Sequence, residues 1–578
     1  MSEKFFFIKW CIKNFISVII YYLYKIIIQI KKRRRKNIYN KNFSFKFIDN
    51  FNEINSKRIN INKTIHLAGK EFKITKNINW IKKFRDNEDE ERLHRFSWVI
   101  DLISERKVSK KKLLWIEHEL LYWYKSFHKE IKNKKTNSLK WHPYTISERI
   151  SNVYLFYIYL NRKIPEIIKQ CIYNETIYLI KNLEFFYNSV NNHIINNTRA
   201  IYYASLICKN EKFKKTSIRI FVSSINKLIT KDGFLREGSS HYQLIFHRWI
   251  FEIFYFSKKE NDKVFFTYLE KINKKLCNGS LFFATYNNCK DFPLFGDISP
   301  DFTPDWIKDF PKIYLNRRIF KTKYKSWNNI FYKIIDYKHL KFINHNLKST
   351  YKNSGWFKFK KFEHEIILRF NKHEPIIFPG HFHDDLGHFI YSYKKKQVFI
   401  DTGRKNYNNS NDFYGNNHNS LTLNKLTVIP KNKKLPIEYS RSINKITYIN
   451  SKDKLKIILK MSGFSRIKKS LNWIREINLL KSKIVITDLL NKKLKNSLVN
   501  NYFYTNKICH KKSGCIYLNL NNFKGIIRSN ILNVGIYNYK AATKQYGKFE
   551  TINQIKYSNI MNSKNKVNKN QFIIDWNI

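Results

Sequence analysis

The sequence predicts two large domains, a long helical array followed by an antiparallel β-sandwich. From residue 78 to about residue 332, apolar side chains recur at intervals of three and four, the spacing of one face of an α-helix. Beyond about residue 338, apolar and polar residues alternate instead, as they do along half-buried strands. A chain of 578 residues is also too long for one ordinary core. These observations place the domain boundary at residues 330–350.

The chain is strongly basic, with 109 Lys and Arg against 44 Asp and Glu and a net charge of +65. An anionic partner is one explanation, and nucleic acid, an anionic membrane and an acidic polysaccharide are the candidates. Compositional bias is the other, and it accounts for most of the excess because the basic residues are dispersed along the chain. We expect no nucleic-acid binding, since no recognisable module for it is present. The seven cysteines show neither metal spacing nor a disulfide framework.

Residues 1–36 are predicted to form a basic amphipathic helix. Their apolar stretch is interrupted by Lys9, Lys13 and Lys25 and ends in the run KKRRRK. The longest uninterrupted run, residues 14–24, is too short to span a bilayer, and no signal-peptide cleavage site follows. A helix lying on an anionic membrane surface fits best, with an uncleaved anchor or a helix packed on the protein as alternatives. We therefore expect a location in the cell envelope, periplasmic or membrane-associated, with the cytoplasmic face of the membrane as the alternative.

The remaining chain divides at about residue 335. Residues 37–75 look irregular, and the helical pattern that follows includes KKLLWIEHELLYWYKSFHKEI, TISERISNVYLFYIYL and SIRIFVSSINKLIT. Helical runs joined by short polar segments suggest hairpins arranged as an α/α array or an incomplete α/α toroid over residues 37–335. Residues 336–578 contain GWFKFKKFEHEIILRFN, KLKIILKM, SKIVITDLL and FIIDWNI, short alternating runs separated by Asn, Gly and Lys turns. Many short strands in series indicate an antiparallel β-sandwich.

Residues 379–419 gather several potential metal ligands or catalytic groups: His381, His383, Asp385, Asp401 and His418. We predict a strand at LGHFIYSY, a turn at KKK and a second strand at QVFIDTG. Residues two apart on a strand share a face, so His381 and His383 are expected to point the same way, and the hairpin returns Asp401 to the His383 end. Two imidazoles and one carboxylate suit zinc. The alternative is a solvated strand end with scattered histidines.

Three further segments carry candidate functional residues. In NSVNNHIINNTRA, Asn192 and His193 lie between two helical runs, where an ordinary helix–helix turn is the alternative. In DGFLREGSSHYQ, a serine cap places Tyr242 in the first turn of a helix, the alternative being a core tyrosine. In WHPYTISERISN, aromatic faces can stack on sugar rings and an arginine can clamp a carboxylate, or they can form an aromatic core with a surface arginine. A fourth segment, FPLFGDISPD at 292–301, is interpreted as a structural loop.

Taken together and in this order, these segments resemble the heparinase II/III-type polysaccharide lyases. The resemblance runs from about residue 80 to the C-terminus and rests on WHPYTISERISN, NNHIINN, DGFLREGSSHYQ, FPLFGD, PGHFHDDLGHF, FIDTG, the pair His418–Asn419 and QYGK at 545–548. It implies an α/α toroid joined to a β-sandwich. It also implies β-elimination, in which a uronic-acid-containing glycan is cleaved at the 4-O bond to leave an unsaturated sugar.

The resemblance further implies which residues perform the reaction. Asn192 and His193 would hold the uronate carboxylate, on which charge builds when the C5 proton leaves. Tyr242 would exchange protons with C5 or the leaving oxygen, and His381 would be the second acid/base group.

The resemblance also implies a bound metal ion and a group of substrate-binding residues. Zinc, mainly structural, would be bound by His383, Asp401 and His418. A further tyrosine of the family pattern corresponds to either Tyr407 or Tyr414, and the sequence does not decide between the two. The residues expected to bind substrate are Trp141, Tyr144, Arg149, Tyr407 and Tyr414.

Other functions are compatible with the same sequence. A non-catalytic glycan-binding or surface-polysaccharide assembly protein would share the fold and the acidic polysaccharide partner. A glycoside hydrolase would need a pair of carboxylates, and Glu237 with Asp232 is the only nearby candidate.

Overall fold

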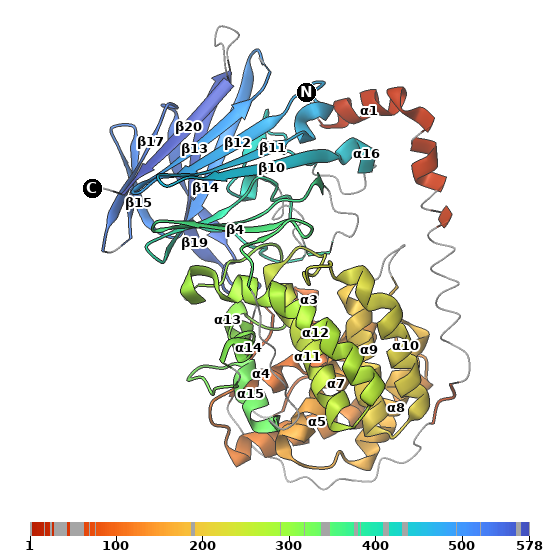
Figure 1. The fold of residues 1–578 in the computed structure, drawn as a ribbon. Helices are drawn as coiled ribbons and strands as arrows, with labels where there is room; N and C mark the ends of the chain where they lie inside the picture. The colour runs from red at the N-terminus through yellow and green to blue at the C-terminus, as the bar shows by residue number, and fades with distance from the viewer. Residues whose placement is uncertain are drawn as a thin grey trace.

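The computed structural model describes residues 3–16, 18–23, 26–27, 43–46, 63–68, 70–74, 77–185, 191–289, 291–316, 318–336, 347–374, 380–381, 383–407, 415–430, 437–492, 494–520, 522–561 and 568–576. Figure 1 shows two bodies, one made of helices and the other of sheets, with the N-terminal helix lying beside the sheets. The predicted fold class, a helical toroid followed by an antiparallel sandwich, is confirmed.

The helical domain is built from helices whose apolar faces meet in one core. The main ones are α3 (Asn87–Arg95), α4 (Ser97–Ile103), α5 (Lys110–Phe127), α6 (Lys129–Lys132), α7 (Pro143–Leu160), α8 (Glu166–Lys181), α9 (Asn192–Ile207), α10 (Glu211–Leu228), α11 (Ser240–Lys259), α12 (Lys263–Ala284), α13 (Pro304–Ile307), α14 (Lys312–Asn316) and α15 (Trp327–Ile334). Side chains of Ser109, Asn210 and Ser239 accept backbone N–H groups and so begin α5, α10 and α11. Helix α9 packs against both α7 and α10, and α11 packs against α12.

A short hairpin precedes the helices, in a stretch that the sequence predicted to be irregular. Strands β1 (Lys63–His66) and β2 (Glu71–Ile74) pair antiparallel. Ile65, Phe72 and Ile74 are buried in the same core as the helices. The prediction was wrong here because four-residue strands are too short to show a clear alternation, and their packing against the helices stabilises them.

Within the described residues, the second domain contains three antiparallel sheets that enclose a separate core. The nine-stranded sheet has the order β15-β16-β17-β20-β13-β12-β11-β10-β6, the four-stranded sheet β18-β19-β14-β9 and the five-stranded sheet β3-β4-β5-β7-β8. Strand β12 alternates strictly between buried and half-buried residues, so one face of its sheet covers the core. The strands are β3 (Thr350–Tyr351), β4 (Trp356–Lys361), β5 (His364–Arg369), β6 (His373–Glu374), β7 (Ile390–Tyr393), β8 (Lys396–Phe399), β9 (Leu421–Leu423), β10 (Ser442–Asn450), β11 (Leu455–Met461), β12 (Trp473–Leu479), β13 (Lys483–Leu490), β14 (Ser497–Thr505), β15 (Ile508–Lys512), β16 (Cys515–Asn519), β17 (Lys524–Ser529), β18 (Val534–Ala541), β19 (Glu550–Met561) and β20 (Asn568–Asp575).

The two domains meet through an apolar cluster of their own. Phe234 and Phe295 of the helical domain pack against Trp356 of β4, and all three are buried. Polar contacts flank the cluster, including a bond between the hydroxyls of Tyr286 and Ser392 at 2.5 Å. Buried aromatic contacts of this kind stabilise the interface between the two domains.

The N-terminal helix α1 (Glu3–Lys13) begins against the sandwich. Glu3 forms an ion pair with Arg466, 2.9 Å from Nε, and accepts from the Tyr439 hydroxyl at 2.5 Å. The rings of Phe7 and Trp10 pack on Tyr439. Other apolar side chains of the segment are exposed (Phe5, Ile8, Ile12, Phe15, Ile16, Ile19, Ile20, Leu23). In the described part of the chain, no helix is both long enough and apolar enough to cross a membrane.

Candidate active site and metal site

The candidate site lies where the helical domain meets the sandwich. Asn192 is the first residue of α9, and Tyr242 lies in the first turn of α11, where its N–H is bound by the capping Ser239 hydroxyl. His381 of the sandwich approaches these helix ends. Gly296, with a φ of +71°, permits the approach, because a Cβ there would lie 2.4 Å from the carbonyl oxygen of His381.

Three of the predicted catalytic residues are brought together at this contact. The rings of Tyr242 and His381 are stacked, with centroids 3.5 Å apart and planes 6° apart. Asn192 Nδ2 lies 3.3 Å from His381 Nε2. The Tyr242 hydroxyl bonds to that of Tyr407 at 2.9 Å, so Tyr407 joins the cluster. Tyr414, the other open candidate, lies outside the described residues.

The segment that carries His381 and His383 is irregular, whereas the sequence predicted a strand from residue 386. Strand β7 begins only at Ile390, and His388 N–H closes a turn onto the Asp385 carbonyl at 2.9 Å. The prediction was wrong because Gly387 has a φ of +78° and lies against Trp473, where no side chain would fit. The predicted β7–β8 hairpin with its lysine turn is present. Its two turn lysines adopt positive φ, as a tight hairpin requires.

Asp297 is the residue on which both histidines converge. Its Oδ1 accepts from His383 Nε2 at 2.8 Å, and its Oδ2 accepts from His381 Nδ1 at 3.1 Å and from Arg404 at 3.2 Å. Burial alone would raise the pKa of Asp297, but the bonds from the two histidines and the charge of Arg404 hold it far below its usual range. Sequence reasoning missed this residue, since FPLFGDISPD was interpreted as a structural loop. The available signal was an acidic residue directly after a glycine within one of the family-like motifs.

Two further carboxylates support α9. Glu237 Oε1 accepts the backbone N–H of Asn192 at 2.8 Å, and its Oε2 lies 3.6 Å from His381 Nε2. Glu184 pairs with His193 Nδ1 at 2.8 Å. Asp232, the other half of the carboxylate pair considered for a hydrolase, instead accepts from Ser354 at 3.0 Å.

The predicted substrate-binding residues of the helical domain divide into two groups. Tyr144 packs against His193 with ring centroids 4.5 Å apart, at the edge of the cluster. Arg149 is fully buried and donates to Glu175 at 3.0 Å, while Trp141 Nε1 donates to Glu130 at 2.7 Å. The structure therefore places Arg149 and Trp141 in interior contacts of the helical domain and does not bring them to the cluster.

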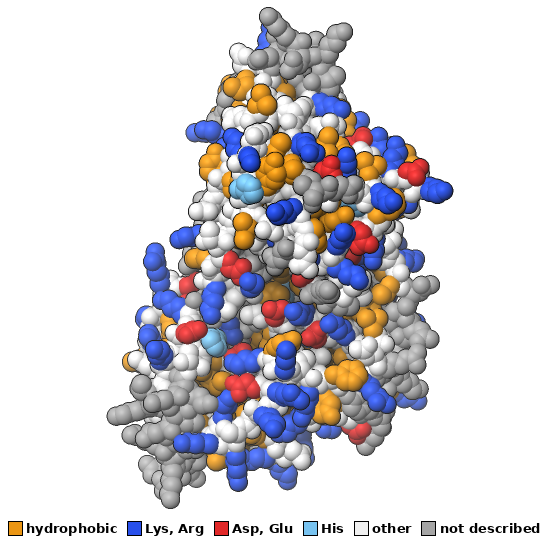
Figure 2. All heavy atoms as spheres, turned by 90° about the vertical axis from the view of Figure 1, so that its left-hand side faces the viewer, with side chains coloured by type: hydrophobic (Ala, Val, Ile, Leu, Met, Phe, Trp, Pro, Cys, Tyr) orange, Lys and Arg blue, Asp and Glu red, His pale blue; other side chains and the backbone are white. Residues whose placement is uncertain are grey.

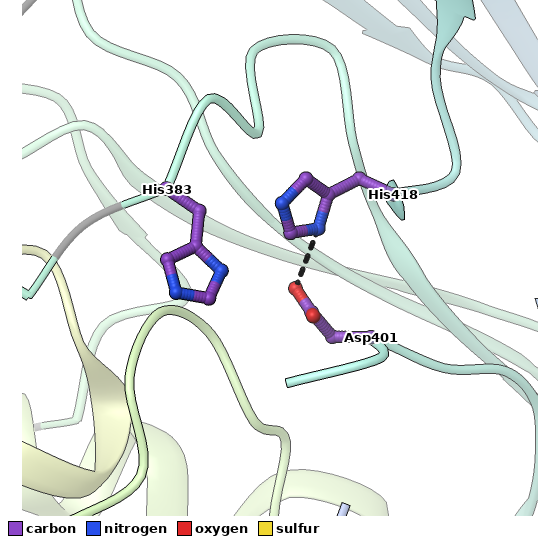
Figure 3. Close-up of side chains that lie close together, drawn as sticks. All are labelled: His383, Asp401 and His418. Carbon is purple, nitrogen blue, oxygen red and sulfur yellow. Dashed lines mark ion pairs between the residues drawn. The ribbon is translucent and has the colours of Figure 1, made fainter. Parts of the chain in front are cut away.

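Figure 3 shows the side chains of His383, Asp401 and His418 pointing toward one another. One possible ligand atom from each lies within 4.8 Å of the others, and all three residues are buried. His418 Nδ1 lies 3.2 Å from Asp401 Oδ2. Burial opposes ionisation of Asp401, but the charge of His418 and the bonds from His388 and His418 together hold the pKa of this carboxyl well below its usual range.

The surroundings of this triad hold it in place. Asp401 Oδ1 accepts the N–H of Gly403 at 2.9 Å, and His388 Nε2 lies 3.3 Å from Asp401 Oδ2. His388 was not among the predicted residues. Asp385, which was expected near the ligands, is instead bound by Arg369. Metal-ligating side chains are usually oriented by such outer partners.

Comparisons with known proteins bear on the whole chain. A sequence model of the heparinase II/III N-terminus matches residues 25–316, just over half of the chain. Comparison with curated proteins finds no match. Among solved structures, the chain is similar to heparinase III, at 15% identity over 86% of this chain and 79% of that chain with a TM-score of 0.61. It is also similar to the heparan sulfate lyase HepC from Pedobacter heparinus, at 15% identity over 88% and 80% with a TM-score of 0.51. At such identity these structures establish the fold, and the match over residues 25–316 establishes that the chain belongs to the heparinase II/III family.

Proposed function

We propose that this protein is a polysaccharide lyase that cleaves a uronic-acid-containing glycan by β-elimination. The observation that carries the proposal is the convergence of Asn192, Tyr242 and His381 from two domains. Family membership and the two-domain fold support a lyase. The positive charge of the chain favours an acidic polymer as the substrate.

Neutralisation of the uronate carboxylate is the first requirement of the reaction. Loss of the C5 proton builds negative charge on that carboxylate, so donors aimed at it lower the barrier. The Asn192 amide supplies a neutral donor and His193 a cationic one. Burial disfavours the charged imidazole, but the ion pair with Glu184 outweighs burial and raises the pKa of His193. His193 therefore keeps its charge to a higher pH than an ordinary histidine does.

His381 and Tyr242 are suited to the two proton transfers. Asp297 accepts from His381 Nδ1, which leaves Nε2 as the basic ring atom. His381 Nε2 takes the C5 proton, the C5–H electron pair forms the C4=C5 double bond, and the C4–O4 bond breaks. Tyr242 donates its hydroxyl proton to O4, and exchange with solvent then restores both groups. Burial raises the pKa of Tyr242 well above its ordinary value, so its hydroxyl carries a proton at neutral pH.

We also propose that His383, Asp401 and His418 hold a zinc ion. Two imidazoles and one carboxylate form a donor set that zinc favours, with a further position left open. His418 Nε2 is buried and has no hydrogen-bond partner within the described ranges, as expected of a ring that can turn toward a metal. When bound, zinc would cross-link the loops that carry its ligands and so order the neighbouring segment with His381.

Product analysis with the wild-type protein is the direct test. The protein is incubated with heparan sulfate and with other glycans rich in uronic acids, and ultraviolet absorbance and reducing ends are followed together. β-Elimination creates a conjugated double bond, so both signals should rise with at least one glycan. New reducing ends without absorbance would indicate hydrolysis. Binding to a glycan without any new chain end would indicate a glycan-binding protein on this fold.

A further inference from the structure

We propose that Asp297 couples the metal site to the acid/base histidine, so that metal binding fixes the orientation of the His381 ring. The role of His381 in turnover rests on the proposed function, whereas the coupling itself rests on contacts alone. Asp297 is then a positioning residue that acts through His381.

The geometry of the carboxylate carries this inference. Each oxygen of Asp297 binds a different histidine, Oδ1 at 2.8 Å from His383 Nε2 and Oδ2 at 3.1 Å from His381 Nδ1. His383 is one of the three candidate ligands, and with Nε2 bound to Asp297 its Nδ1 is the ring atom that can ligate a metal. One planar group therefore joins a ligand directly to the proposed base.

Asp297 is itself held firmly, so it can transmit a change in orientation. Only 2% of its surface is exposed, and Arg404 binds Oδ2 at 3.2 Å. Its backbone N–H donates to the His381 carbonyl at 2.9 Å, and its carbonyl accepts from the Ser239 hydroxyl at 2.8 Å. Because the carboxylate is restrained in this way, a metal that fixes the His383 ring also fixes the Oδ1 contact of Asp297, and through Oδ2 it limits the orientations open to the His381 ring.

A second route connects the same residues, because His381 and His383 are only two positions apart in the chain. Binding of a metal by His383 could move His381 through the backbone without Asp297. The experiment must therefore separate the side-chain route from the backbone route. Asp297→Asn does this, since the amide keeps the size of the side chain but replaces one of the two accepting oxygens by an NH2 group, which cannot accept an N–H from a histidine.

Nuclear magnetic resonance of ¹⁵N-labelled histidines gives a readout that does not need turnover. The His381 imidazole signal is assigned by its loss in His381→Gln, and zinc is then removed with a chelator and restored. In the wild type we expect the His381 signal to shift with metal content. In Asp297→Asn, with zinc present at saturation and metal content measured, we expect that shift to shrink severalfold. Asp301→Asn is the matched control, a buried aspartate of the same loop that binds Arg95 and Ser97.

The outcomes separate the two proposals. If the His381 signal of the wild type does not shift when zinc is removed or restored, the coupling is overturned, whatever the variants show. An equal zinc-dependent shift of the His381 signal in the wild type and in Asp297→Asn also overturns the coupling through Asp297, because the backbone then transmits the change. If the coupling is present but no glycan is cleaved, the proposed function fails and the coupling stands. If a glycan is cleaved, Asp297→Asn should lower kcat more than it raises KM and should alter the pH profile, whereas Asp301→Asn should not alter that profile.

Discussion

The Tyr242 hydroxyl is the group whose removal tests the proposed acid most cleanly. Tyr242→Phe keeps the ring that stacks on His381 and removes only the bond to Tyr407. Loss of a proton-transfer group costs ~100- to 10,000-fold in rate, so we expect kcat to fall by that factor while KM and thermal stability change little. Tyr154→Phe is the control, a buried tyrosine that stacks on Tyr203 within the helical domain. Steady-state kinetics that show most activity in Tyr242→Phe would assign the acid elsewhere.

The ion pair between His193 and Glu184 predicts a pH dependence. The pKa of His193 is raised, so the charge that binds the carboxylate is present at low pH and is lost as the pH rises through that raised pKa. Ionisation of Tyr242 does not contribute to this loss of activity, because burial raises its pKa well above the ordinary value of a tyrosine. Glu184→Gln removes the partner and should move the alkaline limb of kcat/KM to lower pH. An unmoved limb in Glu184→Gln, or an equal movement in the control Glu130→Gln, would contradict the role of His193.

The residues of the candidate site differ in whether they can be predicted from the sequence. Asn192, Tyr242 and His381 could be predicted as site residues because each lies in a distinctive local motif. Asp297 and Glu184 could not, because their partners come from separate segments and only tertiary packing brings them together. Arg149 lies in a motif as well, but its full burial beside Glu175 depends on how α7 and α8 pack.

At the scale of single elements, periodicity was reliable for long segments and failed for short ones. The long helices α5, α7 and α10 lie where an apolar spacing of three and four predicted them. The four-residue strands β1 and β2 were missed, and the start of β7 was placed too early because a turn at Gly387 interrupts an alternating pattern. Short elements are stabilised by contacts distant in sequence, which local patterns do not contain.

The N-terminal helix is an element with an exposed apolar surface next to basic charge. Ile12 and Ile16 are 76% and 74% exposed, and lysines at positions 4, 9 and 13 lie on the same segment. The only acidic residue of this helix, Glu3, is neutralised by Arg466. Apolar side chains and unopposed positive charge together suit the surface of an anionic bilayer.

We therefore predict that the helix associates with anionic membranes. The full chain should co-sediment with vesicles containing phosphatidylserine at low salt, and added salt should weaken binding, since each basic residue contributes about 1 kcal/mol at such a surface. Ile12→Asp with Ile16→Asp should reduce sedimentation. Val264→Asp, which changes an 86% exposed apolar residue of α12, should not. Binding that resists high salt and alkaline extraction would indicate a membrane-inserted anchor instead.

At the scale of the whole molecule, the basic side chains of the described residues form no single patch on the face drawn in Figure 2. Figure 2 shows blue side chains over both domains, with fewer red ones between them. A dispersed charge agrees with compositional bias as the source of most of the excess. It also provides a long-range attraction for any acidic polymer, which salt screens.

The proposed zinc site leads to a prediction about the stability of the folded chain. Zinc at 100 times its dissociation constant would add about 2.7 kcal/mol to the stability of the folded chain. A chelator should therefore lower the melting temperature of the wild type, followed by calorimetry, and should have no effect on His418→Ala. His510→Ala, a histidine of β15 in the same sandwich, should respond to the chelator as the wild type does. Zinc at one equivalent per chain in His418→Ala would show that the ligands are misassigned.

The aromatic contact of Phe234 and Phe295 with Trp356 affects the order in which the protein folds and becomes active after synthesis. Each domain has its own core and can acquire secondary structure by itself. The cluster of Tyr242 and His381, however, exists only once the two surfaces have docked. During refolding from denaturant, recovery of the far-ultraviolet circular dichroism signal should therefore precede recovery of turnover, and the interval between them measures the time of docking. Recovery of activity would thus report when the last step of assembly, the docking of the two domains, is complete.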